Sequence, residues 1–162
     1  YRGCAGRAAP RTMPARASPE ALLEEFLRVW ERLREAAARP ATVVVVEGER
    51  DRESLRRLGL ESPIDLVHHG APLAEVARSI GERYRTAIVL TDWDRKGGQL
   101  AQRLKGFLEA DGVTIDLDLR RRLGHALRGE VAHVEGLGGW AHRIAERAST
   151  TWPQAIETRA SR

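Results

Sequence analysis

Cysteine is nearly missing from this chain of 162 residues, in which Cys4 is the only one. A single thiol excludes an internal disulfide framework and any zinc site built from clustered cysteines. Long apolar runs are missing too, because no stretch approaches the roughly 18 residues that a membrane-spanning helix needs. The N-terminus also lacks the apolar core of a signal peptide. We therefore expect a cytoplasmic protein that does not contact membranes.

Acidic side chains are absent from the first 18 residues, although the rest of the chain is rich in them. The net charge is +4, and four of the 27 Lys and Arg residues lie in this segment. The remainder therefore holds 23 basic and 23 acidic residues, which excludes a generally basic protein. We predict a disordered basic tail over residues 1–18, either a solvated leader or a flexible arm that contacts phosphate.

A helical pattern begins where the tail ends. Ser18 is a typical capping residue, Pro19 suits the first helical turn, and Pro40 ends the pattern. Apolar residues recur at helical spacing at Leu22, Leu23, Phe26, Leu27, Trp30 and Leu33. The segment 19–40 is therefore predicted to be an amphipathic helix that packs on the domain that follows.

Aliphatic segments alternate with helical ones through the rest of the chain. Strands are predicted at residues 42–46, 64–67, 86–92 and 113–119, with a short one at 131–134. Helices are predicted at residues 50–60, 72–84, 97–112, 120–129 and 136–149. This alternation predicts one α/β domain over residues 41–149, with a mainly parallel sheet of about four strands covered by helices on both faces. Residues 150–162 show no clear pattern and are expected to form a C-terminal tail.

Polar residues follow the ends of these strands. Glu47 and Gly48 follow the first strand, His68 and His69 the second, Asp92 and Asp94 the third, and Asp116 and Asp118 lie at or near the end of the fourth. In an open parallel sheet, ligands bind outside the carboxyl ends of the strands. We therefore expect these side chains to share one edge and to form a functional site.

Asp92 and Asp94 have the spacing of a metal-binding pair. In an extended chain residues i and i+2 face the same way, so the two carboxylates point together while Trp93 points away. Close carboxylates repel unless a cation neutralises them, and oxygen ligands of this kind suit Mg²⁺, with Mn²⁺ as an alternative. Gly97 lies at the start of the next helix, whose N-terminus can receive anions.

Glu47 is a candidate for proton transfer beside such a metal. A carboxylate near a metal-bound phosphate can act as a general acid or base, and Gly48 leaves the backbone accessible. Asp51 lies in the first turn of the following helix. It either supports the metal through water or is an ordinary acid at a helix start.

Taken together, Glu47-Gly48-x-x-Asp51 after one strand and Asp92-x-Asp94-x-x-Gly97 after another resemble the Toprim domain. The resemblance covers roughly residues 41–135 and implies a compact Rossmann-like fold. Toprim domains occur in bacterial primases, type IA and type II topoisomerases, old-family nucleases and the ribonuclease that matures 5S ribosomal RNA. The resemblance implies that Glu47 is the general acid or base and that Asp92 and Asp94, with Glu47 beside them, hold Mg²⁺. Many relatives have proline at the position of Trp93.

Several activities fit this resemblance. Topoisomerases use a tyrosine nucleophile, and neither Tyr1 nor Tyr84 is placed for that role. Residues 130–162 do not match the RNA-binding C-terminal region of the maturation nuclease. We expect a small primase-like Toprim protein with metal-dependent endonuclease activity on RNA or DNA. A primase-like nucleotidyl transferase and a non-catalytic nucleic-acid-binding adaptor remain as alternatives, and a protein partner could supply specificity.

Basic side chains near the predicted edge are candidates for contacts with nucleic acid. They are Arg95, Lys96, His68, His69, Arg120, Arg121 and Arg122. The two histidines are equally well explained as a solvated turn, and the arginine run as an exposed helix face. Trp93 is expected to be a packing residue. His125, His133 and His142 are too scattered in sequence to indicate a metal site, and Glu135 is interpreted as part of a turn into the last helix.

Overall fold

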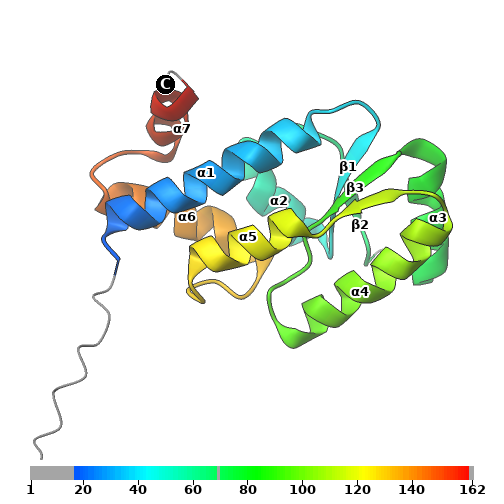
Figure 1. Ribbon diagram of the computed structural model, residues 1–162. Coiled ribbons are helices and arrows are strands. Elements are labelled where there is room, and N and C mark those ends of the chain that lie inside the picture. The colour runs from blue at the N-terminus through cyan, green and yellow to red at the C-terminus, as the bar shows by residue number, and fades with distance from the viewer. Residues whose placement is uncertain (1–16, 69, 161–162) are drawn as a thin grey trace, which may run out of the picture.

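Four parallel strands form the centre of the computed structural model, which describes residues 17–68 and 70–160 (Figure 1). The strands are β1 (Thr42–Val46), β2 (Ile64–Leu66), β3 (Thr86–Val89) and β4 (Thr114–Asp116). Their order across the sheet is β2-β1-β3-β4, and Val44 in the central strand β1 lies opposite both Ile64 and Ile88. The predicted α/β class and four-stranded sheet are confirmed, and every strand pair is parallel.

Helices cover both faces of this sheet. They are α1 (Pro19–Ala37), α2 (Glu49–Arg57), α3 (Leu73–Arg83), α4 (Arg95–Ala110), α5 (Asp118–Leu127), α6 (Leu137–Arg147) and α7 (Trp152–Ala160). Val43 and Val45 pack into the cluster beneath α3 and α4, whereas Val44 and Val46 pack beneath the other five helices. Alternate residues of a strand face opposite sides, so a strand covered on both faces is apolar at every position. This explains the run of valines in β1.

The N-terminal helix α1 forms as the sequence predicts. The Ser18 hydroxyl accepts a hydrogen bond from the Ala21 N–H at 3.2 Å, and Pro19 occupies the first turn. Phe26 and Trp30 are fully buried, and Phe26 lies 5.1 Å from the ring of Trp140 in α6. The apolar stripe of α1 therefore covers the same face of the sheet as α5 and α6.

A helix follows Thr150, where the sequence shows no clear pattern. Helix α7 places Trp152 against the core at 3% exposure, and the indole N–H donates to the Leu58 carbonyl at 3.2 Å. Only Trp152 and Ala155 are buried among the α7 residues whose side chains the structure describes. Two buried positions are too few to produce a helical period in the sequence.

The predicted strand at 131–134 is wrong. This segment leads into a 3₁₀ turn, η1 (Val134–Gly136), and its backbone bonds to the loop after β3 instead of to a strand. The Trp93 N–H donates to the Ala132 carbonyl at 2.8 Å, and the Val134 N–H donates to the Asp92 carboxylate at 2.8 Å. Because these polar groups are already satisfied by the loop, the segment does not extend the sheet.

Several predicted boundaries also move. The strand predicted at 86–92 ends at Val89, so Asp92 lies in the loop after β3 and not in the strand. The strand predicted to reach residue 119 ends at Asp116, whose carboxylate accepts the Leu119 N–H at 3.0 Å and so starts helix α5. Asp118 therefore lies in the first turn of α5, not at a strand end. Helix α4 begins at Arg95, two residues before the predicted start, because Asp94 caps it.

Helix length and composition leave no candidate for a membrane span among the residues that the structure describes. The predicted tail at residues 1–18 falls outside this part of the chain, except for its last two residues.

Candidate metal and phosphate site

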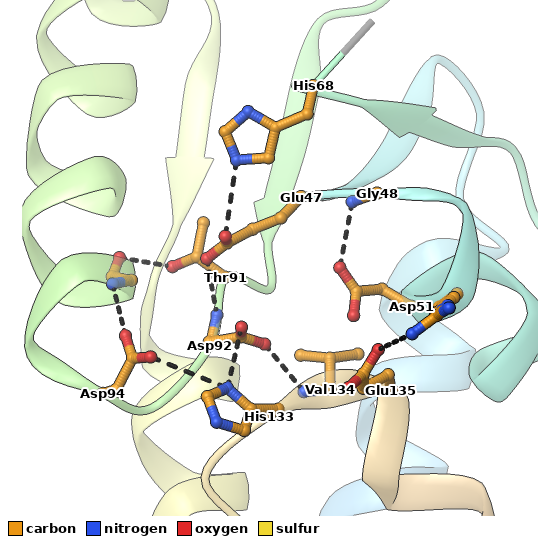
Figure 2. Close-up of polar contacts among 12 residues, drawn as sticks. Glu47, Gly48, Asp51, His68, Thr91, Asp92, Asp94, His133, Val134 and Glu135 are labelled. Atoms are coloured by element: carbon orange, nitrogen blue, oxygen red, sulfur yellow. Dashed lines mark hydrogen bonds and ion pairs between the residues drawn. The ribbon is translucent and has the colours of Figure 1, made fainter.

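The loops that follow β1 and β3 meet at the carboxyl edge of the sheet (Figure 2). Glu47 Oε1 accepts a hydrogen bond from the backbone N–H of Asp92 at 3.0 Å, although the two residues are 45 positions apart. Central strand β1 pairs directly with β3, so their exits are neighbours. The predicted meeting of Glu47 with the aspartate pair is therefore present.

Asp92 is held by its backbone and by both carboxylate oxygens. Oδ1 accepts the Val134 N–H at 2.8 Å, and Oδ2 lies 3.0 Å from Nδ1 of His133. Oδ1 is thus anchored to η1, while Oδ2 faces the imidazole. This anchoring selects one rotamer of a side chain that is largely shielded from solvent.

Asp94 divides its two oxygens in a similar way. Oδ1 accepts the Gly97 N–H at 2.7 Å and caps helix α4, whereas Oδ2 lies 3.6 Å from His133 Nδ1. The helix cap therefore consumes the Gly97 N–H that the sequence suggested for anion binding. It also turns the second oxygen toward the same imidazole that Asp92 contacts.

Asp92, Asp94 and His133 together form the group in the described chain that could hold a metal ion. One ligand atom from each residue lies within 4.8 Å of the other two. The Oδ1 atoms of Asp92 and Asp94 accept backbone N–H groups of η1 and α4. The two Oδ2 atoms therefore face His133 and are the oxygens that could bind the ion. Two carboxylates and an imidazole are a donor set that Mn²⁺ accepts readily, whereas Mg²⁺ favours oxygen alone. The residues present therefore fit a divalent cation.

The His133 imidazole lies between the two aspartates. Its hydrogen bond to Asp92 is the main cause that raises the pKa of His133, and the charges of Asp92 and Asp94 act in the same direction. A protonated imidazole is thus a local counter-ion for the carboxylate pair. Deprotonation frees the same nitrogen to act as a ligand.

Gly97 is required by the packing of the loop against α4. A Cβ at this position would meet the carbonyl oxygen of Asp92 at 2.0 Å, which no backbone can accommodate. Thr91 completes this contact, because its buried hydroxyl donates to the Gly97 carbonyl at 2.7 Å. The glycine of the Asp92-x-Asp94-x-x-Gly97 motif therefore permits the close approach that presents both aspartates.

Glu47 lies beside the metal-binding group but outside it. Its second oxygen, Oε2, is 3.5 Å from Nε2 of His68, and about one fifth of the Glu47 side chain is exposed. His68 lies at the rim and is open to solvent, as predicted. His69, also predicted at this rim, lies outside the described residues. The predicted role of Glu47 as a further metal ligand stays a prediction.

Asp51 lies in the first turn of α2 and also lines the pocket beside Asp92, so both interpretations that the sequence left open still stand. Its Oδ2 accepts the Gly48 N–H at 2.9 Å, and the side chain is only 7% exposed. Burial raises the pKa of Asp51, and the nearby Asp92, Glu47 and Glu135 carboxylates raise it further, against the opposing effect of the Gly48 hydrogen bond. Asp51 thus positions the backbone beside Glu47 and adds negative charge to the pocket.

Arg120 supports the aspartate loop from behind. Its guanidinium donates to the carbonyls of Thr91, at 3.0 Å, and Asp92. Burial lowers the pKa of Arg120, although Glu47, Asp92 and Asp94 oppose that effect. The half-buried guanidinium is therefore bonded to the protein backbone, and its predicted role in binding nucleic acid stays a prediction.

Trp93 packs as predicted. Its indole N–H donates to the Arg120 carbonyl at 2.8 Å, and its ring lies so close to Gly124 that a Cβ there would be 2.7 Å from the ring. The other predicted basic residues, Arg95, Lys96, Arg121 and Arg122, are exposed. Arg121 and Arg122 both pair with Asp118 on the surface of α5.

His133 and Glu135 were not among the residues predicted for the site. Both line a pocket of about 380 Å³ together with Glu47, Asp51 and Asp92. His133 is 41 residues from Asp92 in the sequence. No repeat or motif spacing connects the two positions. The backbone contacts of residues 131–134 with the Asp92 loop bring His133 in, and sequence periodicity carries no sign of those contacts.

Comparison with known proteins agrees with this architecture. The sequence matches the family model of the Toprim domain over residues 42–119. A UPF0292 protein from Thermococcus gammatolerans is 39% identical over 116 residues, which cover 72% of this chain and 83% of that protein. A UPF0292 protein from Methanosarcina barkeri is 35% identical over 122 residues, covering 75% and 84% of the two chains.

A solved structure of a protein from Aquifex aeolicus has the same fold. It superposes with a TM-score of 0.56 at 24% identity, and the alignment covers 70% of this chain and 95% of that one. The family match spans both acidic motifs, Glu47-Gly48-x-x-Asp51 and Asp92-x-Asp94-x-x-Gly97. The chain therefore belongs to the UPF0292 family, and its residues 42–119 match the Toprim domain.

Proposed function

We propose that this protein cleaves phosphodiester bonds in nucleic acid with the help of a divalent metal ion. The observation that carries the proposal is the convergence of Asp92, Asp94 and His133 within 4.8 Å, next to Glu47. Toprim domains suggest metal-dependent chemistry on nucleic acids, and the site has the ligands for it. Hydrolysis within RNA or DNA is the reaction we favour.

A divalent ion bound there would neutralise phosphate charge and stabilise the charge that develops during phosphoryl transfer. Asp92 and Asp94 would hold it through the oxygens that face His133. Mn²⁺ fits the nitrogen-containing donor set better than Mg²⁺ does, and both ions suit the carboxylates. The pocket is rich in acids, which is costly for a pure binder of polyanions because like charges repel.

Glu47 is the residue we assign to proton transfer. It lies in hydrogen-bond contact with the Asp92 backbone, which holds its carboxylate at the edge of the metal-binding group. Because Oε2 faces the open pocket near His68, it can take a proton from an attacking water or return one to a leaving oxygen. His68 is exposed and can exchange that proton with solvent.

The substrate phosphate would approach from the open side of the pocket. Arg95 and Lys96 are exposed in the first turn of α4, directly after Asp94. They supply positive charge where a phosphate chain would leave the acidic pocket.

The test is a cleavage assay on fluorescently labelled RNA and DNA hairpins of the same base sequence, with Mn²⁺ or Mg²⁺ added. We expect Glu47→Gln to lower the cleavage rate by at least about a hundredfold, the usual range for a general acid or base. Asp92→Asn should lower it by a similar factor, because it removes a charged ligand of the ion. Matched controls are Glu75→Gln and Asp111→Asn, which change exposed acids at α3 and the end of α4.

Equal cleavage by the wild-type protein and by both site variants would overturn the proposal. Nucleoside triphosphates are added to a parallel reaction with a template. Extension of the labelled strand, without cleavage, would show nucleotidyl transfer instead. Binding that survives in Glu47→Gln, with no turnover of either hairpin by the wild-type protein, would identify an adaptor.

A further inference from the structure

A second charged feature lies where α1 and α5 run side by side (Figure 1). Helices α1 and α5 pack against each other on one face of the sheet, and a hollow of about 230 Å³ lies between their exposed sides. We name it the α1–α5 trough. It is lined by Glu25, Arg28, Val29 and Arg32 from α1 and by Arg121, Arg122 and His125 from α5.

Positive charge dominates the trough. Four arginines and one acid, Glu25, line it. Glu25 is already paired with Arg128 at 2.9 Å, so its charge is offset by a fifth arginine. Asp118 is shared between Arg121 and Arg122, so one carboxylate faces two guanidiniums. The trough therefore attracts a ligand with several negative charges.

The opposite flank of α1 has a different character. Glu31 and Glu35 lie there and line a separate hollow together with Glu61 and Arg34. The basic residues of α1 that border α5 are thus Arg28 and Arg32, one helical turn apart. Such segregation places the attraction for anions on the α5 side of the helix.

The trough continues toward the acidic site. An adjoining hollow shares Arg121 and His125 with it and reaches Trp93. Trp93 lies between Asp92 and Asp94 in the chain, and its indole N–H bonds to the Arg120 carbonyl, which fixes the ring. The two hollows therefore lead from the arginines to the Trp93 side of the metal-binding loop.

We propose that the α1–α5 trough binds the phosphate backbone of the nucleic-acid strand as it leaves the acidic site past Trp93. This inference rests on the proposed function, because it assumes that the acidic site receives a nucleic acid. Arginines along a groove bind phosphates without reading the base sequence. The trough therefore sets the path and affinity of the strand, while the acidic site sets the chemistry.

The experiment measures binding of labelled RNA and DNA hairpins to the whole chain in EDTA, with Asp94→Asn as the parent so that no cleavage occurs. Two trough variants, Arg28→Gln/Arg32→Gln and Arg121→Gln/Arg122→Gln, each remove two exposed arginines. Arg78→Gln/Arg103→Gln is the matched control, since it removes two exposed arginines from α3 and α4 beyond the opposite face of the sheet.

We expect each trough variant to bind at least about tenfold more weakly at low salt. If both arginines contact duplex phosphates, the slope of log affinity against log salt also falls by about two. The control pair should keep the affinity and slope of the parent. Circular dichroism of each variant checks that the helices are intact.

Trough variants that bind both hairpins like the parent would overturn the inference, as would a control that loses equal affinity or a parent that binds neither hairpin. The cleavage assay in Mn²⁺ is read separately. If binding depends on the trough arginines but the wild-type protein cleaves neither hairpin, the proposed nuclease activity is refuted and the trough is still a binding surface. Cleavage with binding that does not depend on the trough refutes the trough alone.

Discussion

His133 Nδ1 lies 3.0 Å from Oδ2 of Asp92, and the same nitrogen lies 3.6 Å from Oδ2 of Asp94 (Figure 2). One imidazole thus faces both aspartates of the acidic motif. It can be the counter-ion of the pair when protonated and a third ligand when neutral. Metal binding and protonation therefore compete for one atom.

Replacement of His133 by alanine should weaken Mn²⁺ binding by about tenfold or more and affect Mg²⁺ much less. The reason is that the imidazole adds a nitrogen donor, which Mn²⁺ tolerates better than Mg²⁺. Isothermal titration calorimetry of both ions against wild type and His133→Ala measures the effect. Asp111→Asn serves as a control for charge on the exposed surface. Equal losses for both ions would show that His133 has no role in ion preference.

The metal-free protein should lose stability as the pH rises through the folded pKa of His133. The hydrogen bond to Asp92 raises that pKa above the unfolded value, so the folded state holds the proton more tightly. The contribution of the His133 proton to the free energy of unfolding is complete below the unfolded pKa of His133 and disappears above its folded pKa. Urea unfolding in EDTA at several pH values, comparing wild type with His133→Asn, measures it. A difference between the two proteins that does not change with pH contradicts the prediction.

Asp51→Asn should make the metal-free protein more stable at neutral pH, by roughly 1 kcal/mol. Burial raises the pKa of Asp51, so its ionised form is disfavoured in the folded protein. An asparagine oxygen can still accept the Gly48 N–H. Because the pKa of Asp51 is higher in the folded than in the unfolded protein, the free energy of unfolding falls as the pH rises from the unfolded pKa to the folded pKa.

Unfolding curves of Asp51→Asn and wild type should therefore converge at acid pH and separate toward neutrality. Glu53→Gln, an exposed change on the same helix, should follow the wild type throughout. A less stable Asp51→Asn protein at neutral pH would mean that the charge itself holds the turn.

Gly97→Ala should destroy the site, whereas Gly98→Ala should be tolerated. The added Cβ at position 97 would meet the Asp92 carbonyl at 2.0 Å, but at position 98 its nearest neighbour is the Arg120 guanidinium at 3.9 Å. Alanine in the helix at position 98 should even stabilise the protein by about 0.5–1 kcal/mol. Thermal unfolding and metal titration of the two variants test this contrast. Equal behaviour of the variants would contradict it.

Local pattern was enough to predict the sheet, most helices and the acidic motif. Buried strands show as aliphatic runs because both faces are covered, and α1 shows as an apolar stripe with a serine cap. Glu47 and Asp92 could be placed at one edge because parallel strands present their carboxyl ends together. Each of these inferences depends on residues close together in the chain or on a general rule of sheet topology.

Contacts across long stretches of sequence decided the rest. His133 joins the aspartates, and Arg120 holds their loop, through bonds to backbone groups that leave no spacing to recognise. Helix α7 contributes few buried side chains, so its amphipathic pattern is weak although Trp152 completes the core. The chain alone thus indicates that Asp92 and Asp94 can bind a metal, but not that His133 joins them. Only the packing of η1 and α5 against the loop after β3 decides which side chains face the metal site. The reason is that hydrogen bonds to residues distant in the sequence select the rotamers of the carboxylates.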